Sequence, residues 1–331
     1  MKRLLSVILI AALGWSGYWF VGAKAARNGF EQWFDARQSE GWLAEQSEIS
    51  VAGFPNRFDT TFDDIALADP ETGVAWSAPF FQLLSLSYRP NHLIAIWPDR
   101  QQLAFPDQKI AISSEDMKAS VVLGADPSLP LERSNLAVAA LGLRSDAGWA
   151  VAADSLQLAL HRAPETAHSY RFALSAVGFA PSTATPLSNG HPLPHRFKTI
   201  EADLVAGFDR AWDRRALEEA RPQPEWIEIR KAEIVWGDLE LHAAGRVTVS
   251  PAGYPVGEIT LRATNWREIV AIARGSGQIP PGVLDAIVGG LELLSGLAGN
   301  PQRLDIPLNF RNGATRIGPV AIAPAPRLVL R

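Results

Sequence analysis

The sequence has 331 residues and contains no cysteine. This absence excludes disulfides, cysteine-ligated zinc sites, iron–sulfur clusters and thiol catalysis. It does not fix the compartment, because an oxidising space permits disulfides without requiring them. An excess of basic residues is absent as well, since the formal net charge is −4. Nucleic acid is therefore not an expected partner.

Motifs of the common enzyme classes are also missing. No Gly-x-Ser-x-Gly elbow, P-loop or Gly-x-Gly-x-x-Gly fingerprint occurs in the sequence. The short glycine groups at 275–277 and 289–290 are interpreted as a helix end and a packing point. The sequence therefore predicts no catalytic residues, no cofactor site and no metal site, and we expect the protein not to be an enzyme.

One long hydrophobic run lies near the N-terminus. Residues 4–21 form 18 positions without a charge, directly after Lys2 and Arg3. About 20 apolar residues span a bilayer core, and basic residues favour the cytoplasmic side. Aromatic residues crowd the far end of the run, as in an interfacial belt: Trp15, Tyr18, Trp19 and Phe20. We predict a transmembrane signal anchor over 1–23, a single pass through the bacterial inner membrane and a body in the periplasm.

A cleaved signal peptide is the alternative, because Ala23, Lys24 and Ala25 resemble a small-x-small cleavage site. The run is long for a signal peptide, however, and it ends in bulky aromatic residues. The helical pattern also continues past this site, since Phe30, Trp33 and Phe34 have the spacing i, i+3, i+4. We therefore favour an uncleaved anchor followed by a juxtamembrane helix over 24–46.

The rest of the chain changes to a period of two. Hydrophobic residues alternate with polar ones in sets such as Leu84/Leu86/Tyr88, Met117/Ala119/Val121, Leu156/Leu158/Leu160 and Tyr170/Phe172/Leu174. This period indicates strands with one buried and one wetter face. Many such strands in series predict a mainly β fold: a long antiparallel meander, curled into a groove or an open barrel-like sheet, with few helices.

A loop rich in proline, serine and threonine at 181–195 divides this body. We expect a β-rich subdomain over 47–180 and a second over 196–331 with two to three helices. The helices are predicted at 208–220, after Asn265, and from Pro281 onward. The pair Asn312-Gly313 predicts a closing hairpin with a type I′ turn.

Several polar pairs have spacings that could form sites. His191 and His195 have the spacing of metal ligands on a helix, but the prolines between them exclude a helix. The carboxylate pairs at 63–64 and 218–219 are interpreted as solvated faces. Adjacent residues on a strand point in opposite directions, so Asp63 and Asp64 do not meet in one cleft as acid–base catalysis requires. Arg57 and Asp59 share a face at i and i+2, and we expect an ion pair in a structural corner.

The order of these features resembles a known family. The features are the anchor, the sequence GFPNRFD at 53–59, GYPVGEI at 253–259 leading into Asn265 and Trp266, and the closing hairpin with Ile317-Gly318-Pro319. Together they resemble the alphaproteobacterial family called domain of unknown function 2125, which has no established activity. More distantly, an anchored β-meander with Gly–aromatic–Pro corners is similar to the AsmA-like envelope proteins. That similarity implies a sheet curled into a groove and a role in lipid traffic or outer-membrane upkeep.

The resulting hypothesis is a non-enzymatic, membrane-anchored periplasmic protein that binds a lipid or another hydrophobic ligand in a β groove for envelope maintenance. The alternative is a structural or assembly protein that makes protein contacts in the cell envelope. The sequence also predicts that Leu158 lies on an inward apolar face, where a charge would cost several kcal/mol, of the order of burying an unpaired polar group.

Overall fold

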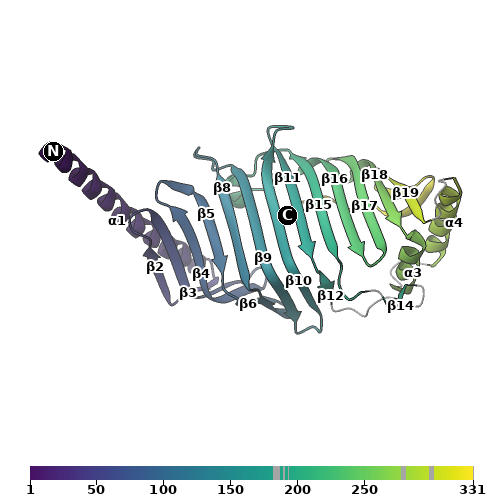
Figure 1. Cartoon of the computed structure of the whole chain (residues 1–331), viewed down its shortest axis with the longest axis horizontal. Helices are drawn as coiled ribbons and strands as arrows, with labels where there is room; N and C mark the ends of the chain where they lie inside the picture. Colours follow the sequence, from purple (N-terminus) through teal and green to yellow (C-terminus); the bar gives the residue numbers. More distant parts are fainter. Residues whose placement is uncertain (182–186, 189–190, 193, 277–280, 298–301, 331) are drawn as a thin grey trace. The chain divides into compact units, whose positions relative to one another are not determined.

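The computed structural model describes the whole chain except residues 182–186, 189–190, 193, 277–280, 298–301 and 331. Antiparallel strands dominate the described part, which confirms the predicted mainly β fold (Figure 1). The chain forms two compact units. Unit 1 consists of Met1–Ala125 with Ser134–Ala150, and unit 2 of Asp126–Arg133 with Val151–Arg331. The predicted loop at 181–195 thus falls inside unit 2.

Unit 1 begins with one long helix, α1 (Lys2–Ser39), which contains both the hydrophobic run and the juxtamembrane segment. The predicted end of this helix at residue 46 is wrong. Gly41 has a φ of +89°, a left-handed conformation that favours glycine and ends helices. The residues after it form a strand, β1 (Leu43–Glu45), which pairs with β3 through Leu43 and Ala68.

The strands of unit 1 form an antiparallel meander around β3 and β4. They are β1, β2 (Glu48–Ala52), β3 (Arg57–Asp69), β4 (Val74–Leu86), β5 (Arg89–Trp97), β6 (Arg100–Phe105), β7 (Gln108–Ser113), β8 (Asp116–Leu123) and most of β9 (Leu131–Ser145). Strand β3 pairs with β1, β2 and β4. Strand β4 pairs with β5 along one end and with β6 along the other, so β5 and β6 lie end to end. Strands β8 and β7 extend this arrangement outward.

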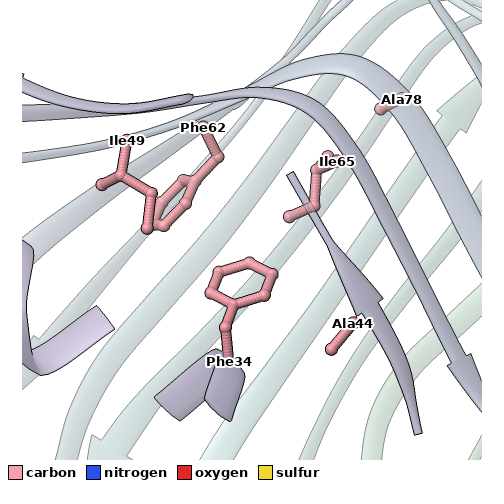
Figure 2. Close-up of a cluster of buried hydrophobic side chains, with 6 residues drawn as sticks. All are labelled: Phe34, Ala44, Ile49, Phe62, Ile65 and Ala78. Atoms are coloured by element: carbon pink, nitrogen blue, oxygen red, sulfur yellow. The ribbon is translucent and has the colours of Figure 1, made fainter. Parts of the chain in front are cut away.

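The core of unit 1 lies between α1 and the sheet. Figure 2 shows Phe34 of α1 pointing toward Phe62 and Ile65 of β3, with Ile49 and Ala78 beside them. Partly buried residues complete this cluster: Phe30, Trp42, Leu67, Trp76, Phe81 and Leu83. The aromatic spacing at 30, 33 and 34 therefore belongs to a helix face that packs on the sheet.

Unit 2 is a second antiparallel meander. Its main strands are β10 (Ala150–Ala163), β11 (Ser169–Val177), β15 (Thr199–Phe208), β16 (Pro224–Trp236), β17 (Leu239–Val249), β18 (Pro255–Thr264), β19 (Arg303–Arg311), β20 (Ala314–Ile317) and β21 (Val320–Pro324). Each of these strands pairs with the next. The short strands are β12 (Ala180–Pro181), β13 (Leu187–Ser188) and β14 (His191–Pro192).

The register of unit 2 separates an apolar from a polar face. Directly opposed residues share a face, and one row across the sheet is Leu158, Leu174, Ala202, Ala232, Ala243, Leu261 and Ile306. The adjacent row is Gln157, Ser175, Glu201, Glu233, His242, Arg262 and Asp305. Leu158 lies on the apolar face as predicted, but it is 40% exposed. The predicted apolar interior around it is therefore wrong: the face is open at this point.

The predicted helix over 208–220 is also wrong. Strand β15 continues to Phe208, and the helical part that follows is a single turn, α2 (Arg215–Glu218). The intervening chain is held by tertiary contacts. The ring of Trp212 packs edge-on against Phe208 at 5.6 Å, and the Trp212 carbonyl accepts a hydrogen bond from the Leu131 amide.

Two helices, α3 (Trp266–Ser276) and α4 (Pro281–Leu297), connect β18 to β19 close to the predicted positions (Figure 1). They cover this end of the unit 2 sheet through a tight cluster of Trp266, Leu291, Ala263, Leu304 and Ile306. The closing hairpin also matches its prediction. Asn312 and Gly313 have φ angles of +53° and +69°, as a type I′ turn requires.

Candidate functional site

An apolar cavity of about 670 Å³ lies in unit 1 between α1 and the sheet. Its helix wall consists of Gly22, Ala25, Ala26, Gly29, Phe30, Trp33 and Phe34. Its sheet wall consists of Phe58, Thr60, Phe62, Ile65, Leu67, Trp76, Phe81, Leu83, Ser85, Pro90 and Leu93. Volumes of roughly 300–1,000 Å³ are typical of small-molecule sites.

The cavity exists because the helix presents small side chains where it lies opposite large ones. Positions 22, 25, 26 and 29 follow the spacing i, i+3, i+4, i+7 and therefore share one face of α1. They carry only glycine and alanine, so the helix cannot fill the space above the sheet. Phe30 and Phe34 then close the far end, where Phe30 packs edge-on against Phe62 at 5.0 Å.

A local irregularity in β3 keeps the sheet wall apolar. Phe58, Thr60 and Phe62 are even-numbered, whereas Ile65 and Leu67 are odd-numbered, yet all five line the cavity. A regular strand would send the two sets to opposite faces. The switch occurs at Asp64, whose φ of +49° departs from the strand conformation. The Asp64 carboxylate instead accepts a hydrogen bond from Ser47 Oγ at 3.0 Å.

The lining of this cavity determines what it can bind. It contains no charged side chain, and its side-chain hydroxyls come from Thr60 and Ser85. The indole N–H of Trp76 is already used, since it donates to Gln101 Oε1 at 2.7 Å. Ala25 and Gly29 are exposed, so the cavity opens to the outside along the helix. The site therefore suits an aliphatic ligand and offers little for polar recognition or acid–base chemistry.

The end of the cavity near Gly22 is fixed by three hydrogen bonds from α1 to loop backbone. Trp15 Nε1 donates to the Pro55 carbonyl at 3.0 Å, and Trp19 Nε1 donates to the Arg57 carbonyl at 2.6 Å. Tyr18 donates its hydroxyl proton to the Ser87 carbonyl at 2.6 Å. These bonds hold the helix against the β2–β3 and β4–β5 connections.

The first turns of α1 make no such contacts. Leu4, Leu5, Ile10 and Leu13 are each more than 60% exposed. The hydroxyl of Ser6 donates to the Lys2 carbonyl, and that of Ser16 donates to the Ala12 carbonyl, so both are satisfied within the helix. Within the described chain, α1 is the helix long and apolar enough to cross a membrane.

The polar pairs that the sequence singles out are not among the described residues that line this cavity. Asp63 pairs across the sheet with Glu48, and Asp64 is exposed. Glu219 is exposed as well, whereas the side chains of Glu218 and His191 lie outside the described residues. Within the residues that the structure describes, no group of three or more His, Asp or Glu side chains could hold a metal ion.

Arg57 and Asp59 do form the expected ion pair, with Arg57 Nη2 and Asp59 Oδ2 2.7 Å apart. They begin β3 at the corner beside Gly53, whose φ is +98°. A Cβ on Gly53 would lie 2.9 Å from the Arg57 carbonyl oxygen, so the turn requires glycine there. The pair therefore belongs to the structural corner that Trp15 and Trp19 contact.

Sequence reasoning missed the cavity residues on the helix. The signal was present in the small residues at 22, 25, 26 and 29, which lead directly into the aromatic face at 30, 33 and 34. This pattern alone does not predict a cavity, because the space also depends on the side chains of the sheet opposite the helix.

A known protein family matches most of the chain. The family described as "Uncharacterized protein conserved in bacteria (DUF2125)" matches residues 19–326. The chain belongs to this family. No curated protein and no solved structure matches the chain. The similarity to AsmA-like proteins therefore stays a prediction. The family description names no activity, so membership in DUF2125 assigns no role to any residue of the cavity.

Proposed function

We propose that this protein is held in the bacterial inner membrane by α1, with its body in the periplasm, and that it binds an acyl chain of a membrane lipid in the cavity of unit 1. The role is binding rather than catalysis, in the upkeep of the cell envelope. One observation carries the proposal: the cavity wall begins at Gly22, immediately after the apolar run at 4–21.

This position matters because an acyl chain leaving the bilayer stays beside apolar atoms. The run of residues 4–21 provides a surface of lipid-exposed aliphatic side chains, and the small-residue face at 22, 25, 26 and 29 continues it. Each methylene transferred between water and an apolar site changes the free energy by about 0.8 kcal/mol. A route without a water-exposed step is therefore strongly favoured for a lipid tail.

The helical continuity of α1 supports an uncleaved anchor. Residues 23–25, which resemble a cleavage site, lie inside the helix, and Ala23 is buried. Fusion of a cytoplasmic and a periplasmic reporter to the C-terminus tests the orientation. An active cytoplasmic reporter with a silent periplasmic one would contradict it, and a mature chain that starts at Ala26 would contradict the anchor.

The test of the ligand site is a pair of matched substitutions on α1. Gly29→Leu places a side chain in the cavity, and a Cβ at Gly29 meets no atom within 4 Å. Gly17→Leu makes the same change on the same helix, also with no atom within 4 Å, but Gly17 does not line the cavity. Lipids that remain with the detergent-purified full-length chain are quantified by mass spectrometry.

We expect Gly29→Leu to lower the amount of retained lipid several-fold and Gly17→Leu to leave it unchanged. Equal retention by the wild type and both variants would mean that the lipid only surrounds the anchor, and the cavity proposal would fail.

The second candidate function is that of a structural or assembly protein in the envelope. The open apolar face of unit 2 favours it, since Leu158 in the apolar row is 40% exposed. Apolar patches of this kind serve protein contacts as well as ligands. Crosslinking of the full-length chain in cells, with loss of a specific adduct in Leu158→Ser but not in Gln157→Ser, would support this function.

A further inference from the structure

We propose that two loop tips of unit 1 insert into the lipid headgroup region of the membrane that α1 spans: Phe54 between β2 and β3, and Tyr88 between β4 and β5. This inference rests on the membrane insertion of α1 in the proposed function, but not on lipid binding in the cavity. Insertion of the two tips would fix the position of unit 1 on the bilayer surface.

First, hydrogen bonds hold the two tips against a defined part of α1. The carbonyl of Pro55, next to Phe54, accepts a hydrogen bond from Trp15, and that of Arg57, three residues after Phe54, accepts one from Trp19. The carbonyl of Ser87, next to Tyr88, accepts one from Tyr18. The two tips therefore lie level with residues 15–19 of α1.

The second step places that height relative to the membrane. With a rise of about 1.5 Å per residue, Trp15 lies roughly 9 Å before the end of the apolar run at Val21. The segment from Lys2 to Trp15 measures only about 20 Å, which is less than the roughly 30 Å hydrocarbon core. When the run is inserted, residues 15–19 cannot stand clear of the bilayer, and neither can the loops bonded to them.

The third step is the chemistry of the tips. Phe54 is 52% exposed and Tyr88 is 59% exposed, although both lie on short connections. Phe54 also stacks on Phe20 with ring centroids 5.6 Å apart, so it joins the exposed aromatic residues of α1. Aromatic rings are costly in water at this exposure and are favoured at the membrane interface.

Charge agrees with this placement. The exposed side chain of Arg89 follows Tyr88 directly, and Arg57 follows Phe54 by three residues. Lys24 of α1, also exposed, lies just beyond the apolar run. The carboxylate of Asp59 is paired with Arg57, so it does not leave an uncompensated negative charge at this end. Basic side chains at this level suit the phosphates of lipid headgroups.

The absence of cysteine from the chain makes a clean experiment possible. Single cysteines are introduced in the full-length protein by Phe54→Cys, Tyr88→Cys, Ile10→Cys and Glu71→Cys, and each is labelled with an environment-sensitive fluorophore. The proteins are placed in lipid nanodiscs with and without lipids that carry a spin-label quencher near the headgroup. Glu71 is the matched control, since it lies in the turn at the opposite end of β3, roughly 40 Å away at 3.3 Å per residue.

We expect strong quenching and blue-shifted emission for the labels at 54 and 88, quenching at 10, and neither effect at 71. Quenching at 10 with labels at 54 and 88 that behave like the label at 71 would overturn the inference and leave the anchor intact. No quenching at 10 would overturn the anchor and the inference together. Tyr88 serves as the second site because, among the ring contacts of the described residues, Phe54 contacts Trp19 and Phe20 of α1 and Tyr88 does not.

Discussion

Both units cover part of an apolar sheet face with helices, but with opposite results. In unit 1, α1 presents Gly22, Ala25, Ala26 and Gly29 to the sheet and leaves a cavity of about 670 Å³. In unit 2, α3 and α4 present large residues, and the contact is tight: Trp266 is 2% exposed, Leu291 3% and Leu304 of the sheet 1%. The sheet faces are similar in chemistry, so the helix side chains decide between a closed core and an open site.

This difference has an energetic meaning. Protein interiors are packed to nearly crystalline density, and empty apolar volume weakens a fold. The tight cluster of unit 2 follows this rule and needs no other explanation than stability. A cavity of ligand size with an opening along a membrane-anchored helix departs from it, and occupation by an apolar ligand restores the missing contacts.

The strongest test of this comparison adds the same side-chain volume to the helix–sheet contact of each unit. Ala263→Leu in β18 adds three carbons to a site that is 3% exposed beneath Trp266 and Leu291. We expect a loss of about 1–3 kcal/mol in the free energy of unfolding, because overpacking forces neighbouring side chains out of their rotamers. Ala26→Leu on α1 points the same group into the cavity, and we expect no loss.

Urea unfolding of the detergent-solubilised protein, followed by far-UV circular dichroism, measures both changes. Equal destabilisation by the two substitutions would remove the distinction between a filled and an unfilled helix–sheet contact. A lower free energy of unfolding for Ala26→Leu alone would mean that the contact in unit 1 is the filled one.

The strands could largely be predicted from the sequence, because the alternation of apolar and polar residues persists on both sides of an irregularity in a strand. Ile227 and Ile229 are odd-numbered and Ile234 and Trp236 even-numbered, which a regular strand would place on opposite faces. The structure has one strand, β16, with a register shift between Ile229 and Ala232. The extra residue of this bulge returns the following side chains to the same face. A change of parity within an alternating run is therefore a readable sign of a bulge.

The helix over 208–220 could not be excluded from the sequence. Its charged residues favour a helix locally, and only the tertiary packing of Phe208 and Trp212 near Tyr170 overrides this preference. The cavity was missed for a related reason. Small residues after a membrane anchor have no intrinsic meaning until the sheet opposite them is known, since the space depends on both walls.

The openness of the unit 2 face gives a second, smaller test. Leu158→Asp places a charge in the apolar row beside Leu174, but at 40% exposure water still reaches the site. We expect a loss of about 1 kcal/mol, at the low end for placing a polar group in an apolar environment. Gln157→Asp, one residue away on the polar face, should cost roughly 0.5 kcal/mol or less.

The same urea titration measures this pair. A loss of several kcal/mol for Leu158→Asp would mean that the apolar face is closed in solution, and unit 2 would then be packed throughout. Identical values for the two variants would contradict the separation of the two faces that the register shows.

The smallest expected effect concerns the polar faces of the two units. In unit 2 charged pairs bridge neighbouring strands, for example Arg171 to Asp203, where Arg171 Nε and Asp203 Oδ1 lie 2.8 Å apart. In unit 1 the contact between β3 and β4 is neutral, from Gln82 Nε2 to Thr61 Oγ1 at 3.1 Å. The hydrogen bond from the Arg171 guanidinium lowers the pKa of Asp203 below its ordinary value.

Because the pKa of Asp203 is lower in the folded chain than in the unfolded chain, its contribution to stability is present above the unfolded value near pH 3.9 and is lost as the pH falls through the folded value. Asp203→Asn should therefore be slightly less stable than the wild type at pH 7, and the difference should shrink on acidification below about pH 4. Urea midpoints at both pH values measure this, with Glu225→Gln, an exposed residue of β16, as the control. The effect should stay below that of Leu158→Asp, because Arg171 is half exposed and solvent screens the pair. A difference between wild type and Asp203→Asn that grows as the pH falls would show that the carboxylate is held against its preference, and the cross-strand charges of unit 2 would then weaken the sheet rather than stabilise it.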